Sequence, residues 1–163
     1  MSIQANGQMI LTVLETITTG VPDVITGNSV ITHNSYNVGF SLNANTSPSG
    51  QLVASISQAM TAGAATVNLA SLSGTNGATV NGTGFRVIAI LMTNAGSSTI
   101  TVAAGASNGY SIFGASGQAT LRAGETIMKY DPSGLSTAIS STNKNIDISG
   151  TGTDALRMVI VMG

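Results

Sequence analysis

The residues from Arg86 to Val102 constrain the fold more than any other part of the chain. Val87–Met92 is a run of six apolar residues, and the turn-forming cluster Asn94–Ser98 follows it closely. From Thr99 to Val102 polar and apolar residues then alternate strictly. A short apolar run bounded by turn residues is typical of a strand buried on both faces, whereas alternation is typical of a strand buried on one face. Together the two segments predict a hairpin at the centre of an all-β domain.

Turn clusters rich in Gly, Asn and Ser recur about every ten residues along the chain, with short alternating segments between them. Residues 51–72 fit either two strands or a short helix, and their Ser content and β-rich surroundings favour strands. No segment has the pattern of a long helix. This spacing predicts a β-sandwich or barrel. A count of about eight strands favours a jelly-roll-like sandwich, built from two four-stranded sheets.

Two further hairpins are expected in the second half of the chain. The first joins Ala119–Arg122 to Thr126–Tyr130, and Asp131–Gly134 has the residues of a type I turn after it. The second joins Ile146–Ile148 to Ala155–Met162 through a Ser-Gly-Thr-Gly-Thr turn. Leu156, Met158, Ile160 and Met162 are expected to point together into the core.

The first thirty residues stand apart from this pattern. Met9, Leu11 and Val13 alternate with other residues, and Pro22 interrupts the segment. Residues 1–30 therefore form either an extended N-terminal arm or the first strand of the sandwich, and we place the sandwich domain in residues 31–163.

Charged residues make up only 7% of the chain, and the net charge is −1. In ordinary globular proteins about a quarter of the residues are charged. A surface with so little charge opposes self-association weakly, so we expect the protein to pack against partners or copies of itself.

The five cations are scattered and none precedes Arg86. We therefore expect no nucleic-acid binding and no secretory signal. No apolar run approaches the ~20 residues of a membrane span, so we expect no membrane association either. The absence of cysteine fits synthesis in a reducing cytoplasm.

No motif predicts a metal or calcium site. His33 is the only histidine, has no nucleophile or carboxylate at catalytic spacing, and is expected to be an exposed or locally hydrogen-bonded polar residue. Asp147 and Asp154 flank a Gly/Thr-rich segment that superficially resembles a calcium loop. Such a loop requires carboxylates or amides at alternating positions and a distal Glu, which this segment lacks, so a turn is expected instead.

No pair of carboxylates predicts hydrolytic chemistry either. Glu125, Asp131 and Asp23 are the candidates for an acid–base pair of the glycosidase kind. The chain has no Trp and few other aromatic residues with which to hold a sugar. Glu125 is expected to form a surface pair with Arg122 instead. The sequence thus predicts no catalytic, cofactor-binding or metal-ligating residues, no cofactor, and no enzyme activity.

Four stretches of the chain resemble a family of small structural proteins of tailed bacteriophages. They are VITHNSYNVGFSLNA (residues 30–44), GAATVNLASLSGTNGATVNGTGFRVIAI (63–90), TITVAAGASNGYSIFGASG (99–117) and NKNIDISGTGTDALRMVIVMG (143–163). The shared features are a GTNGATV loop, a GASN turn, a TLxxGE turn and a closing ISGTG turn, in this order.

The resemblance implies a non-enzymatic virion protein located in the capsid. It would be a cement or decoration protein, whose partners are the major capsid protein and its own copies in a homotrimer or homodimer. The alternative is a head-fibre or tail-associated module that binds host-surface glycans. That alternative requires exposed aromatic side chains, for which Tyr36, Tyr110 and Tyr130 are the available tyrosines.

Overall fold

The computed structural model describes residues 4–11, 14–17, 29–32, 36–43, 45–74 and 77–163, and these residues form strands and turns without any helix. The strands are β1 (Gln4–Leu11), β2 (Leu14–Ile17), β3 (Ser29–Thr32), β4 (Tyr36–Asn43), β5 (Leu52–Ala59), β6 (Ala64–Asn68), β7 (Leu72–Ser73), β8 (Thr79–Val80), β9 (Val87–Asn94), β10 (Ile100–Ala104), β11 (Gln118–Leu121), β12 (Thr126–Tyr130), β13 (Asn145–Ser149) and β14 (Ala155–Met162).

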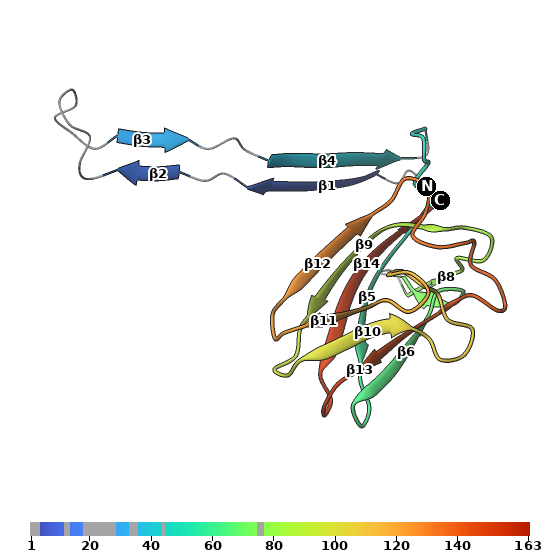
Figure 1. Cartoon of the computed structure of the whole chain (residues 1–163). Helices are drawn as coiled ribbons and strands as arrows, with labels where there is room; N and C mark the ends of the chain where they lie inside the picture. Colours follow the sequence, from blue (N-terminus) through green and yellow to red (C-terminus); the bar gives the residue numbers. More distant parts are fainter. Residues whose placement is uncertain (1–3, 12–13, 18–28, 33–35, 44, 75–76) are drawn as a thin grey trace. The chain divides into compact units, whose positions relative to one another are not determined.

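Eight of these strands build two packed four-stranded antiparallel sheets, in the orders β11–β10–β13–β6 and β12–β9–β14–β5 (Figure 1). The pairs are nested along the chain: β5 pairs with β14, β6 with β13, β9 with β12, and β10 with β11. Such nesting arises when one long hairpin folds over so that its arms are shared between two sheets, which is the jelly-roll arrangement. The expected all-β, jelly-roll-like sandwich is therefore confirmed.

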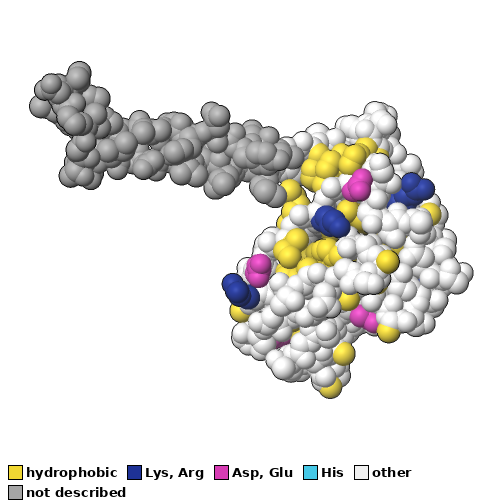
Figure 2. Space-filling view, in the orientation of Figure 1, with side chains coloured by type: hydrophobic (Ala, Val, Ile, Leu, Met, Phe, Trp, Pro, Cys, Tyr) yellow, Lys and Arg dark blue, Asp and Glu magenta, His cyan; other side chains and the backbone are white. Residues whose placement is uncertain are grey.

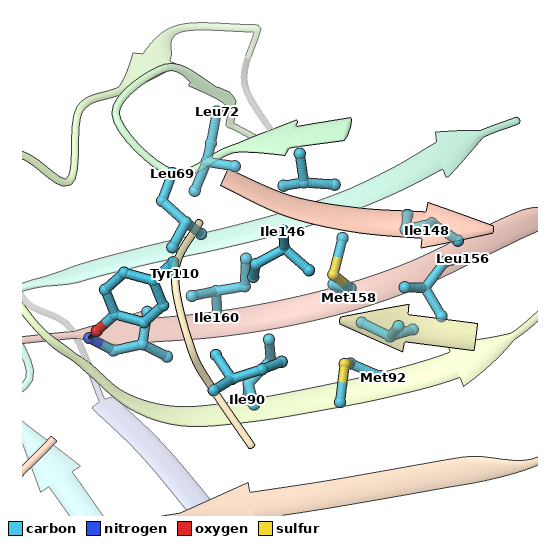
Figure 3. Close-up of a cluster of buried hydrophobic side chains, with 14 of the residues drawn as sticks. Leu69, Leu72, Ile90, Met92, Tyr110, Ile146, Ile148, Leu156, Met158 and Ile160 are labelled. Carbon is cyan, nitrogen blue, oxygen red and sulfur yellow. Dashed lines mark hydrogen bonds between the residues drawn. The ribbon is translucent and has the colours of Figure 1, made fainter. Parts of the chain in front are cut away.

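The core lies between the two sheets, where inward-facing side chains from both meet (Figure 3). None of the ten central side chains is more than 1% exposed, and they come equally from the two sheets. The set is Ile100, Val102, Leu121, Ile146 and Ile148 from one sheet, with Ile90, Met92, Leu156, Met158 and Ile160 from the other. The alternation of β10 and β14 thus has the predicted consequence, because the apolar residues of each strand are buried together.

The run Val87–Met92 is buried on both faces except at Leu91, which is 37% exposed. Residues 51–72 form β5, β6 and the start of the β7–β8 pair, so the expectation of strands rather than a helix is confirmed.

All three expected hairpins are wrong in their pairing, although their strands are correct. β9 and β10 lie in opposite sheets, and so do β11 and β12, and β13 and β14. Each turn cluster carries the chain across one end of the sandwich instead of back along the same sheet. The physical reason is that alternation specifies only which side chains of a strand enter the core. In a sandwich a strand can direct those side chains into the core from either sheet, so alternation does not specify the sheet.

The chain divides into two compact units, Met1–Ala5 with Leu42–Gly163, and Asn6–Ser41. In the second unit β2 and β3 pair antiparallel, and β1 and β4, most of whose residues belong to this unit, form another two-stranded sheet (Figure 1). The boundary expected between residues 30 and 31 falls within β3. The expected break at Pro22 lies outside the described residues.

Candidate functional site

The carboxylate of Asp154 stabilises the turn that links β9 to β10. It accepts hydrogen bonds from the backbone N–H of Ser97 (3.0 Å) and from that of Ser98 (2.8 Å). These bonds hold the pKa of the Asp154 carboxyl below its usual value. Gly96 makes the approach possible, because a Cβ at that position would overlap the Asp154 carboxyl group. Asp154 therefore connects two turns at one end of the sandwich.

Asp147 has a corresponding structural role on β13. Its carboxylate accepts hydrogen bonds from the hydroxyl of Thr66 (2.7 Å) and from the backbone N–H of Ala106 (2.8 Å). Asp147 and Asp154 thus bind groups from turns and strands far away in sequence. The segment between them is a turn, as expected, but it joins opposite sheets.

Glu125 and Asp131 lie at the two ends of β12 and also bind their own turns. The Glu125 carboxylate accepts a hydrogen bond from the backbone N–H of Arg122 (2.8 Å), so its contact is with the main chain of the expected partner. The Asp131 carboxylate accepts one from the backbone N–H of Ser133 (2.8 Å), and the Gly134 N–H bonds to the Asp131 carbonyl, as the predicted turn requires. Six residue steps of about 3.3 Å along the extended chain place the Cα atoms of Glu125 and Asp131 roughly 20 Å apart, far beyond the spacing of glycosidase pairs.

Two of the candidate residues, His33 and Asp23, lie outside the described residues, and so does the side chain of Tyr36. Tyr110 is fully buried, and its hydroxyl accepts a hydrogen bond from the backbone N–H of Val87 (2.9 Å). Burial raises the pKa of the Tyr110 hydroxyl, although the bond from Val87 opposes the rise. Tyr110 therefore belongs to the core and is not available to stack on a glycan.

Asn94, at the end of β9, is the one buried polar residue in the described part of the chain, and the sequence analysis did not single it out. Its Nδ2 donates hydrogen bonds to the carbonyls of Ser98 (2.7 Å) and Leu121 (3.1 Å), and its Oδ1 accepts one from the Gly96 N–H (2.9 Å). An Asn followed by a Gly two residues later signals the local turn. No local signal could have indicated the bond to Leu121, which lies 27 residues away.

The outer faces of the two sheets differ in chemistry. On β11–β10–β13–β6, the register places small uncharged side chains and Asp147 side by side, among them Thr120, Thr101 and Thr66. On β12–β9–β14–β5, Leu91 and Val159 face each other across β9 and β14 and are 37% and 38% exposed. A shallow hollow of about 370 Å³ lies beside them. The face visible in Figure 2 carries few charged side chains, and these are scattered over it.

No protein-family model matches the chain, no curated protein matches its sequence, and no solved structure matches its fold. Within the described ranges, no three His, Cys, Asp or Glu side chains come together in a way that could hold a metal ion. The same residues contain no helix of the length and hydropathy needed to cross a bilayer.

Proposed function

We propose that this protein is a non-enzymatic structural component of a tailed-phage virion, a capsid cement or decoration protein. It would stabilise the head by binding between subunits of the major capsid protein. The resemblance of residues 30–163 to such proteins suggests the class, and the two-stranded construction of the Asn6–Ser41 unit is the observation that supports it most directly.

A ribbon of two strands has little core of its own. Isolated two-stranded sheets are at best marginally stable in water, and they gain stability when a further strand or a packed layer covers them. Within the described residues of this unit, each of the two sheets has only two strands. A capsid surface would supply the missing cover, so the unit suits a clasp that gains stability from contact with a particle.

The surface chemistry of the sandwich fits the same role. Uncharged hydroxyl and amide side chains can form hydrogen bonds across an interface without the large desolvation cost of burying charges. The carboxylates described above are already bound to turns of their own sandwich. A rigid sandwich with a near-neutral surface can therefore occupy many equivalent positions on a shell without performing chemistry.

Co-sedimentation with capsids tests the proposal. The full chain would be mixed with capsids assembled from the major capsid protein encoded in the same genome, and pelleted. A matched variant would replace Asn6–Ser41 by an Asn-Gly turn, which suits a two-residue hairpin loop. We expect saturable binding of the full chain and a loss of at least about tenfold in affinity for the variant, with its β-sheet circular dichroism retained. A full chain that does not pellet with capsids at any concentration would refute the proposal.

The alternative function, glycan binding by a head-fibre or tail-associated module, has a separate test. Burial of Tyr110 removes one of the three tyrosines on which it relied. Binding to a glycan array that disappears in a Tyr130→Ala variant would favour this alternative over the cement function.

A further inference from the structure

The edge of the sandwich at β5 has unsatisfied pairing capacity. β5 is the last strand of its sheet and pairs with β14 along its whole length. It pairs with no other strand in the described part of the chain. In an antiparallel pair, alternate residues direct their N–H and C=O groups away from the partner strand. One side of β5 therefore presents a row of backbone donors and acceptors to its surroundings, in which the Ala59 carbonyl accepts a hydrogen bond from the Gln58 side chain (3.0 Å).

The accessible part of this row is Ser55–Ala59. Ser55, Ser57 and Ala59 are exposed, and the residues between them are half-buried. By contrast, Ala54 is only 1% exposed. The short strands β7 and β8 lie beside β5, and β7 helps to form the wall of a groove at this edge. The groove has a volume of about 320 Å³ and is bounded by Ser55–Gln58, Thr66–Asn68 and Ser71–Gly74.

The other edges of the two sheets have the protections that β5 lacks. β11 and β6 are short, with four and five residues, and β12 has five residues, carries Lys129 and is followed by Asp131 and Pro132. Short length, charge and proline are the usual means by which proteins prevent pairing between sheet edges. β5 has eight residues, with neither a charged residue nor a proline among them.

A second hollow reaches the same segment from the outer face of the sheet. The shallow hollow beside Leu91 and Val159 is also lined by Ser55, Ile56 and Ser57. Two hollows therefore flank the same three residues, and the most exposed large apolar side chains of the described surface lie next to them. An added strand at this edge would extend the hydrogen-bonded sheet beside an outer face on which Val159 lies next to Ser55 and Arg157 lies next to Ser57.

We propose that β5 is the site of self-association, where it pairs antiparallel with β5 of a second copy across a two-fold axis. Such pairing over Ser55–Ala59 places Ser57 opposite its own copy and Ser55 opposite Ala59. In this register a charged residue at position 57 would lie on the two-fold axis and face its own charge, which is unfavourable. The uncharged Ser57 therefore avoids like-charge repulsion at the centre of the pairing. The resulting dimer has one continuous sheet of eight strands.

The test is the solution mass of the full chain, measured by light scattering coupled to size exclusion, for the wild type and two Lys variants. We expect the wild type to have about twice the 16.2 kDa mass of one chain. Ser57→Lys should weaken the dimer by about tenfold or more, because two like charges then oppose each other at close range. Thr120→Lys adds the same charge at an exposed position on β11 and should leave the mass unchanged. A wild type that stays monomeric at all concentrations would overturn the proposal.

Two further measurements keep the result decisive if Ser57→Lys also perturbs folding. An equimolar mixture of Ser57→Lys and Ser57→Glu chains should recover the dimer mass, because opposite charges then face each other. In the wild type, hydrogen exchange at Ser55–Ala59 should slow as protein concentration rises. A dimer whose β5 amides exchange independently of concentration would place the interface elsewhere. Neither measurement involves a capsid, so this proposal can fail while the cement function stands, and the reverse is also true.

Discussion

Replacement of Asn94 by Ala should cost much more stability than its buried volume suggests, because Asn94 connects two corners of the sandwich. The change removes three hydrogen bonds, one of them fully buried and two partly buried. A buried polar group left without its partner costs about 1–3 kcal/mol, and a partly buried bond contributes about 0.5–1.5 kcal/mol. The expected loss in the free energy of unfolding is therefore about 2–5 kcal/mol, since water can partly replace the two outer bonds.

Asn68→Ala is a matched control for this prediction. Asn68 also ends a strand, β6, and its Oδ1 also accepts a hydrogen bond from the backbone N–H two residues later (3.0 Å). The control thus removes the local turn bond that both residues share, at an expected cost of about 1 kcal/mol. The difference between the two variants isolates the Nδ2 bonds of Asn94 to Ser98 and Leu121.

Urea denaturation followed by circular dichroism measures both variants on the same scale. We expect Asn94→Ala to be less stable than Asn68→Ala by at least about 1.5 kcal/mol, with an unchanged dependence on urea concentration. Equal losses in the two variants would refute the reasoning, because they would mean that the connection to Leu121 contributes nothing.

Three other perturbations test individual contacts. Tyr110→Phe should lower the free energy of unfolding by about 1–3 kcal/mol in urea denaturation, because the buried N–H of Val87 loses its acceptor while the ring still fills the core; an unchanged stability would contradict this. The folded-state pKa of Asp154 is depressed below 3.8, so its contribution is present above that pH and is lost as pH falls through the folded-state value. Thermal unfolding should therefore show Asp154→Asn less stable than the wild type at neutral pH, with the gap closing below about pH 3.8; a constant gap would count against it. Gly82→Ala should lower the melting temperature clearly, since a Cβ there would lie 2.6 Å from the Leu69 carbonyl oxygen; a wild-type melting curve would show that the backbone yields easily.

The sequence was sufficient to predict strands and their buried faces. Alternation in β10 and β14 is a local property of the sequence. A side-chain period of two shows which face of a strand is buried, and this does not depend on the strand with which it pairs. The apolar run of β9 likewise identified a central strand. The jelly-roll arrangement followed from the number and spacing of such segments, without any knowledge of their partners.

Strand partners could not be predicted, because they depend on contacts between distant residues. The cluster Asn94–Ser98 has the composition of a hairpin turn, yet it crosses between the sheets. The interactions that hold it there come from Asp154, more than fifty residues later, and from the carbonyl of Leu121. No local pattern encodes these contacts. For the same reason the open edge at β5 became visible only when the order of strands in its sheet was known.

The central claim, that the chain is a capsid cement protein, is tested most directly by electron cryomicroscopy of capsids with and without the protein. We expect additional density at the boundaries between major capsid protein subunits, large enough for the sandwich and repeated over the shell. Capsids that look identical in the two samples, or density restricted to a tail or a fibre, would contradict it.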